Sequence, residues 1–181
     1  GIKSKLNGIK TINLLYCKLI KLKDKDIFLT DDNISLMFFK IVLINSDYHI
    51  GYEILRSELH QLLVGNFKIF SSFEPCIYPG VNSKFFWNKD YKDKEYKGKC
   101  YCKSYCDGKG NGSGDGQCKK VTISAFQSGS IIITGAQTIE QIVDSFNFID
   151  NIFKNYYKQL KKDVPNFINY NNKPKNIIYI E

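Results

Sequence analysis

Arginine is almost absent from this chain: of its 26 lysine and arginine residues, only Arg56 is an arginine. Because the flat arginine fork is the side chain best suited to bidentate contacts with base edges, this scarcity almost excludes arginine-based reading of the DNA major groove. Histidine is also scarce, since His49 and His60 are the only two. The carboxylates are scattered and no phosphate-cradling Gly-Lys motif is present. The sequence therefore predicts a protein that is not an enzyme.

Long apolar runs are missing too. None approaches the ~20 residues that a membrane-spanning helix needs, and the N-terminus has no signal-peptide layout, so we expect no membrane partner. The chain begins without methionine, and we expect that it starts inside a longer protein. What the 181 residues do contain is 43% hydrophobic and 14% aromatic residues, which is enough for a packed core.

Positive charge is in excess and unevenly distributed. The net charge is +8, and the largest share of it falls in residues 84–120, which also hold four of the six cysteines. A basic balance favours a polyanionic partner, and phosphate backbones are the commonest one. The alternative is that an A·T-rich genome alone produces the enrichment in lysine, asparagine, isoleucine and tyrosine.

Apolar periodicity predicts an alternation of helices and strands. Residues at three- and four-residue spacing favour helices over 11–23, 52–63 and 138–160. Continuous or alternating apolar runs favour strands over 36–44, 67–73, 82–87, 121–127 and 130–134. Ser128-Gly129 is typical of a hairpin turn, and Thr138 with Gln141 matches a helix capping box.

A short internal echo indicates a repeat. Leu-Asn-Gly-Ile-Lys-Thr-Ile at 6–12 parallels Ile-Thr-Gly-Ala-Gln-Thr-Ile at 133–139, and each precedes a predicted helix by the same distance. A chance match is the alternative. If the echo is real, three parts follow, the second interrupted by a Cys-rich insertion at 88–119. They are the end of a first repeat (a strand remnant and a helix) at 1–35, a complete second repeat at 36–162 and a C-terminal tail at 163–181.

Four motifs carry a resemblance to a known family. Ser-Ser-Phe-Glu-Pro, Tyr-Pro-Gly, Phe-Gln-Ser-Gly and Thr-Gly-Ala follow one another between residues 71 and 136. In this order they resemble one repeat of the TATA-box-binding protein family, over about residues 37–160 without the insertion. The resemblance implies an α+β saddle, in which a curved antiparallel sheet lies on the DNA minor groove and helices cover its convex face.

The family's DNA-wedging residues transfer onto this sequence one by one. In the family, two phenylalanines per repeat insert between base steps and kink the duplex, which costs a few kcal/mol per step and is offset by the surface that bent DNA wraps. Phe126 stands at one wedge position and Tyr78 at the other. Tyrosine is a departure, because its hydroxyl needs a partner once it is inserted. Ordinary core packing is the alternative role for Phe126.

Other positions transfer with substitutions. Thr134 matches a threonine that faces the minor groove, and Lys84 takes the place of a phosphate-binding arginine. The family's first-strand asparagine aligns with Leu43, but Asn45 lies two residues on and shares that face. Ser124 lies two residues from Phe126 on the same face, with Thr122 farther out. These changes keep the shape of the site and reduce its specific contacts.

The resemblance implies a general transcription initiation factor that binds double-stranded, A·T-rich promoter DNA in the minor groove and recruits other initiation factors and RNA polymerase. The insertion and the composition look most like versions encoded by large DNA viruses, which implies action in the nucleus or in the cytoplasmic viral factory of an infected cell. The alternative is the same fold used as a protein-interaction platform with weak or no DNA binding. Departures at Leu43, Tyr78 and Trp87 motivate it.

The insertion carries a cysteine pattern that lies outside the predicted strands and DNA contacts. Four cysteines surround a glycine-rich stretch, namely Cys100, Cys102, Cys106 and Cys118. Four thiolates suffice for a tetrahedral structural zinc site, and a metal would order a loop that cannot pack itself. One or two disulfides and free thiols are the alternatives. The flanking lysines could reach DNA phosphates, or could form a solvated basic loop.

Overall fold

The computed structural model describes residues 4–23, 35, 41–89, 97–103, 106 and 108–163. Contacts divide the chain into two compact units, residues 1–42 and 43–181, and each unit is described by itself. Residues 36–40 of one predicted strand, the insertion lysines Lys92 and Lys94, and all but the first residue of the predicted tail lie outside the described residues.

The first unit contains helix α1, Lys5–Lys23. The helix begins six residues before the predicted start at residue 11, so the strand remnant expected in this region is wrong for residues 5–10. The Ser4 hydroxyl accepts a hydrogen bond from the Asn7 backbone N–H at 3.1 Å and caps the first turn. Within the described part of this unit no partner strand lies beside these residues, and helical hydrogen bonds are the local way to satisfy their backbone groups.

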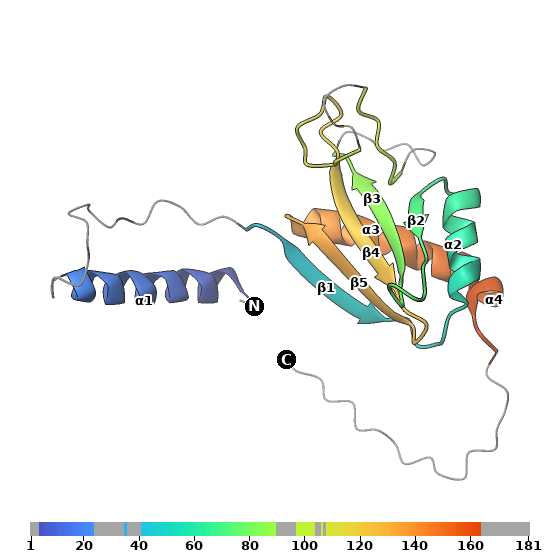
Figure 1. The fold of residues 1–181 in the computed structure, drawn as a ribbon, viewed down its shortest axis with the longest axis horizontal. Helices are drawn as coiled ribbons and strands as arrows, with labels where there is room; N and C mark the ends of the chain where they lie inside the picture. Colours follow the sequence, from blue (N-terminus) through green and yellow to red (C-terminus); the bar gives the residue numbers. More distant parts are fainter. Residues whose placement is uncertain are drawn as a thin grey trace, which may run out of the picture. The chain divides into compact units, whose positions relative to one another are not determined.

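The second unit is built on a five-stranded antiparallel sheet with the strand order β1-β5-β4-β3-β2 (Figure 1). The strands are β1 Ile44–His49, β2 Phe70–Ser72, β3 Val81–Trp87, β4 Lys119–Ala125 and β5 Ser130–Ala136. The described residues 41–43 are not part of β1, although the sequence predicted a strand there. Pairing with β5 begins at Ile44, which lies opposite Ala136, the last residue of β5.

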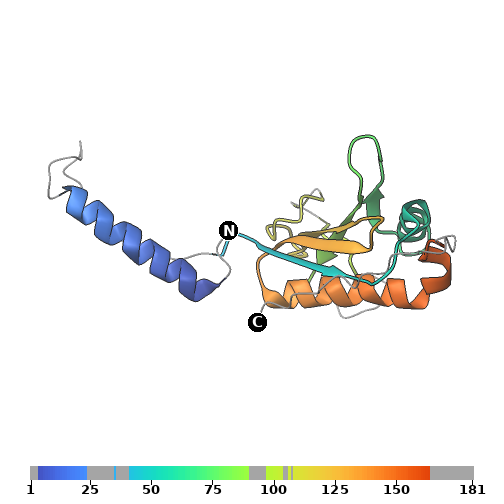
Figure 2. The ribbon, with the colours of Figure 1, turned by 90° about the horizontal axis from the view of Figure 1, so that it is seen from below.

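Three helices lie on one face of this sheet: α2 Arg56–Gly65, α3 Ile139–Asn155 and α4 Tyr157–Leu160 (Figures 1 and 2). Helix α2 starts four residues later than predicted, because Ile54 is held extended by an N–H bond to the Gln127 carbonyl (2.9 Å) and a bridge to Lys161. The predicted cap at Thr138 is confirmed, since its hydroxyl accepts from the Gln141 N–H at 3.3 Å, and the Gln141 side-chain oxygen accepts from the Gln137 N–H at 2.7 Å, one residue before the N-cap.

Alternation along the strands separates a core face from an outer face. Val81, Phe85, Val121, Ile123, Ile131 and Ile133 point toward the helices and are buried, with Leu59, Leu63, Ile149 and Ile152 against them. Burying each such side chain contributes about 1.5–3 kcal/mol. The opposite face, which none of the described helices of the second unit covers, is called the outer face below. It carries the alternate residues, namely Asn45, Asp47, Phe70, Asn82, Lys84, Phe86, Lys120, Thr122, Ser124, Ile132 and Thr134. A curved antiparallel sheet with helices on its other side confirms the predicted α+β class.

Candidate nucleic-acid interface

The outer face brings together residues that are far apart in the sequence. The Thr134 hydroxyl on β5 donates a 2.6 Å hydrogen bond to the side-chain oxygen of Asn45 on β1. Farther across the same face, the Lys84 ammonium on β3 donates to the Thr122 hydroxyl on β4 at 3.2 Å. Two pairs of predicted site residues are therefore neighbours, on strands joined by the registers of β1 with β5 and of β3 with β4.

Tyr78 and Phe126 form an aromatic pair at one end of this face. Their ring centroids lie 5.7 Å apart at an interplanar angle of 61°, in an edge-on arrangement. Tyr78 belongs to the connection between β2 and β3, which stands out from the sheet on the side opposite α3 (Figure 2). Phe126 opens the β4–β5 turn, where its N–H bonds to the Ser130 carbonyl. The hairpin turn predicted at Ser128-Gly129 is confirmed by this bond.

Arg56 braces the two loops that carry the aromatic pair. From the start of α2, its guanidinium donates to the Pro79 carbonyl in one loop and to the Gln127 side-chain oxygen in the other, the latter at 3.0 Å. It also stacks over the Phe73 ring, 5.1 Å from the ring centre. Arg56 thus holds the two loops together, a role that no local sequence pattern indicated.

Lys84 stands in a partly desolvated, positively charged setting. Burial lowers the pKa of its ammonium, and the charge of Lys120 lowers that pKa further. Lys120 pairs with Phe86 and Lys84 with Thr122, so the two lysines are diagonal neighbours on the outer face. Two adjacent ammonium groups that repel each other are a suitable arrangement for accepting an anion such as a phosphate.

Other residues fit the predicted contacts less directly. Ser124 is only 4% exposed on the outer face, so its neighbours cover most of it. Leu43 precedes β1 and is exposed. Asp47, which the sequence analysis did not single out, places a carboxylate on the outer face beside Asn45, and Ile132 lies opposite it on β5. Strict alternation counted from Asn45 would have identified Asp47.

The four insertion cysteines converge into one cluster. Their sulfur atoms all lie within 4.8 Å of one another. The Cys118 sulfur lies 3.3 Å from that of Cys106 and 3.4 Å from those of Cys100 and Cys102. A tetrahedral zinc with bonds of about 2.3 Å requires sulfur separations of about 3.8 Å, and a disulfide requires about 2.05 Å. Four mutually close thiols fit a tetrathiolate metal centre.

The surroundings of the sulfur atoms support that fit. At Gly114, a side-chain Cβ would lie 2.8 Å from the Cys102 sulfur and 2.6 Å from the Cys106 Cβ, so only glycine leaves room for the cluster. The Gly110 N–H donates to the Cys106 sulfur at 3.4 Å and lowers the pKa of that thiol to about 7. Desolvation raises the pKa of Cys118. A cation would compensate this cost, because a metal deprotonates the thiols it binds.

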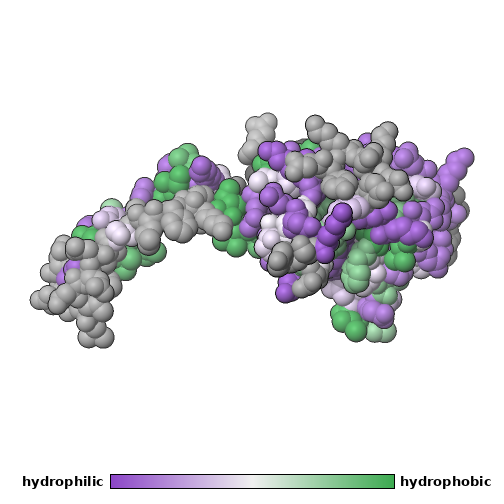
Figure 3. Space-filling model, turned by 90° about the horizontal axis from the view of Figure 1, so that it is seen from above, coloured by the Kyte–Doolittle hydropathy of each residue, from purple (hydrophilic) through white to green (hydrophobic). Residues whose placement is uncertain are grey.

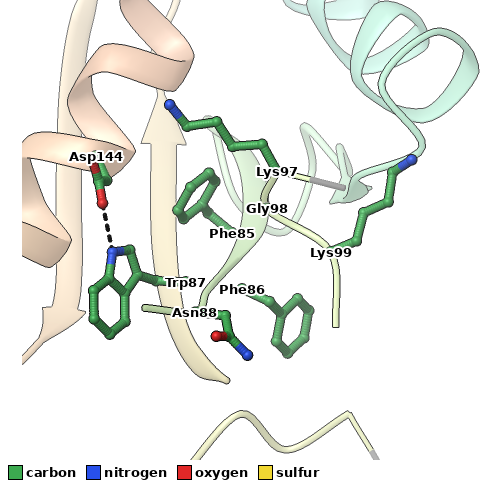
Figure 4. A pocket seen from close by; sticks show the side chains of 8 residues that line it. All are labelled: Phe85, Phe86, Trp87, Asn88, Lys97, Gly98, Lys99 and Asp144. Atoms are coloured by element: carbon green, nitrogen blue, oxygen red, sulfur yellow. Dashed lines mark hydrogen bonds between the residues drawn. The ribbon is translucent and has the colours of Figure 1, made fainter. Parts of the chain in front are cut away.

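A small pocket lies where the insertion returns to the sheet (Figure 4). Trp87 lines it, and its indole N–H donates a 2.6 Å hydrogen bond to the Asp144 carboxylate on α3. Trp87 therefore serves the packing of sheet against helix. The end of the second unit that carries the insertion is mostly hydrophilic (Figure 3). Among the described helices, none is long and apolar enough to cross a membrane.

No protein-family model matches the chain. A TATA-box-binding protein-like protein of Acanthamoeba polyphaga mimivirus is 32% identical to it over 142 residues, which cover 74% of this chain. The chain spans 32% of the length of that protein. The similarity, the order of the motifs and the fold of the second unit together show that this chain is a divergent member of the TATA-box-binding protein family.

Proposed function

We propose that the protein is a transcription initiation factor that binds A·T-rich promoter DNA in the minor groove through the outer face. The observation that carries this proposal is the edge-on pair of Tyr78 and Phe126, which stands at one end of a sheet face that none of the described helices of the second unit covers. Two aromatic rings held together at such an edge have the shape of a wedge that opens a base step.

The rest of the outer face supplies the contacts that a kinked minor groove needs. The Thr134 hydroxyl donates to the Asn45 side-chain oxygen and so orients the amide, whose NH2 group can donate to the acceptor atoms on base edges. Lys84 and Lys120 provide positive charge for phosphates. Minor-groove contacts distinguish mainly A·T from G·C pairs, and deformability adds to the preference, so we expect preference for A·T-rich, flexible steps.

The test is binding and bending of a fluorescently end-labelled TATA duplex by the full protein at several salt concentrations. Phe126→Ala should abolish most of the bending, whereas Phe126→Leu, which keeps a bulky apolar side chain, should retain much of it. Both variants should remain folded, which circular dichroism checks, although Phe126→Ala loses the edge-on contact of about 0.5–1.5 kcal/mol and the burial of its half-buried ring. Unchanged bending by Phe126→Ala would rule out the wedge.

The second candidate function, a protein-interaction platform, is favoured by the charge of Asp47. Asp47 places an exposed carboxylate on the outer face, which opposes a polyanion and suits a basic protein surface. In this case the fold serves as an interaction platform within the transcription machinery. No binding or bending of DNA at low salt, by protein that is folded and metal-loaded, would favour the platform over the DNA-binding role.

We further propose that the cluster of Cys100, Cys102, Cys106 and Cys118 binds one structural zinc ion. Metal analysis of protein purified without chelator should give about one zinc per chain. Cys102→Ser should lose the metal, while Cys76→Ser, at an exposed thiol outside the cluster, should keep it. A stoichiometry near zero in the wild type would reject the site.

The remaining roles follow from the family and are proposals for this chain. The protein recruits initiation factors and RNA polymerase to the bent promoter, has no catalytic activity of its own, and works in the nucleus or the viral factory of an infected cell. Affinity capture of the tagged protein from fractions of infected cells checks both its partners and its location. We expect polymerase subunits to be recovered with it. Their absence from captures that do recover the tagged protein would contradict the role.

A further inference from the structure

The insertion is attached to the sheet by two arms. In the first, the Phe86 N–H at the end of β3 donates to the Gly98 carbonyl at 2.9 Å. In the second, the Lys120 N–H at the start of β4 donates to the Gly110 carbonyl at 2.7 Å. The two arms therefore attach to β3 and β4 at Phe86 and Lys120, which lie opposite each other near the end of the ladder.

The second arm also holds the cysteine cluster. Gly110 donates its N–H to the Cys106 sulfur at 3.4 Å while its carbonyl accepts from Lys120. An ideal Cβ at Gly110 would lie 2.5 Å from the Lys120 Cβ and 2.9 Å from the Phe86 ring. One residue thus joins the sulfur atoms directly to the edge of the outer face.

The lysines near the insertion lie on two different sides. Lys97 and Lys99 line pockets together with the core-face residues Phe85 and Phe148 (Figure 4). Lys120 points to the outer face, where Lys84 is its diagonal neighbour. Of these four lysines, Lys120 and Lys84 share a surface with the aromatic pair, so the charge that they offer to DNA depends on how Lys120 is held.

We propose that the metal-bound cysteine cluster holds Lys120 beside Lys84 in a phosphate-binding corner, so that metal occupancy sets the affinity for DNA. The inference rests on the proposed minor-groove function. Thiolates bound to a metal accept N–H hydrogen bonds that orient them, and the Gly110 N–H is such a donor. When the four thiols lose the metal, Gly110 loses its anchor, and the corner loses the arm that positions Lys120.

The size of the effect follows from counterion release. Each phosphate that a lysine neutralises adds about 0.9 to the slope of log affinity against log salt. At about 0.1 M salt, one lost contact therefore weakens binding about eightfold. Loss of the Lys120 contact should lower the slope by about 0.9 and leave the wedge in place, so that metal-free protein binds more weakly but still bends the duplex.

The experiment titrates the TATA duplex at several salt concentrations with zinc-loaded full protein and with protein stripped by a chelator. Zinc-loaded Lys120→Gln should bind about eightfold more weakly at about 0.1 M salt, and zinc-loaded Lys97→Gln, on the other side of the sheet, should bind like the wild type. In metal-free protein, Lys120→Gln should have little further effect.

The outcomes separate the inference from the function on which it rests. Equal affinity and slope with and without zinc would overturn the inference and leave DNA binding intact. Absence of DNA binding by zinc-loaded protein would overturn both. Circular dichroism shows whether metal removal unfolds the sheet. If it does, the two zinc-loaded variants are compared instead, and equal losses of DNA affinity in Lys120→Gln and Lys97→Gln would overturn the inference.

Discussion

Gly110→Ala is the sharpest test of the link between the insertion and the sheet, and Gly108→Ala is its matched control. Both glycines have a left-handed backbone, with φ of +61° and +68°, so an alanine costs about 1–2 kcal/mol at either position. Their surroundings differ: a Cβ at Gly108 meets nothing within 4 Å, whereas one at Gly110 lies 2.8 Å from the Lys120 nitrogen.

The difference between the two variants isolates the contact. At Gly110, overpacking adds about 1–3 kcal/mol, and displacing the carbonyl from the Lys120 N–H removes about 1 kcal/mol more. We therefore expect Gly110→Ala to cost about 2–4 kcal/mol more than Gly108→Ala. If the insertion detaches as a unit, the global free energy of unfolding records only part of this cost.

Two measurements on the metal-loaded protein distinguish global loss of stability from local detachment of the insertion. Urea unfolding gives the global loss, and hydrogen exchange of the Lys120 amide reports local detachment. In Gly110→Ala this amide should exchange much faster, and in Gly108→Ala nearly as in the wild type. Equal stability losses together with equal exchange rates would refute the reasoning, because the backbone link would then contribute nothing to holding the insertion.

Three further predictions concern charge and packing. Asp47→Asn should tighten DNA binding about two- to fivefold at low salt, since it removes one like charge from the outer face; no change in a duplex titration would indicate that DNA does not reach β1. Hydrogen bonding to Lys162 lowers the pKa of the Glu53 carboxyl. The ionised carboxylate therefore stabilises the fold above the ordinary glutamate pKa, and this stabilisation is lost as the pH falls through the lowered pKa. Glu53→Gln should therefore be slightly less stable than the wild type in urea at about pH 7, and the difference should shrink as the solution is made acidic; a difference that grows in acid would contradict this sign. Trp87→Phe should cost about 1.5–3 kcal/mol in the same assay because it leaves the Asp144 carboxylate without its indole donor, and a loss near zero would show that water replaces the donor.

Local pattern was sufficient for much of the fold. The alternation of residues 82–87 and 130–134 predicted β3 and β5 closely, and Thr138 with Gln141 marked the start of α3. These signals are local, since burial on one face and a cap bond depend on residues a few positions apart. The ends of elements were predicted less well. Helix α2 starts late because Ile54 bonds to Gln127, a contact that no local pattern contains.

By itself, the sequence determined the family, the pair of aromatic residues and the four cysteines, because ordered motifs and residue types are written in the chain. Only the tertiary structure decided how they combine. It placed Lys120 beside Lys84, set Arg56 between two loops, and brought the cysteines to one point. The physical reason is that strand register and loop attachment depend on contacts between distant residues, which neither spacing nor composition specifies.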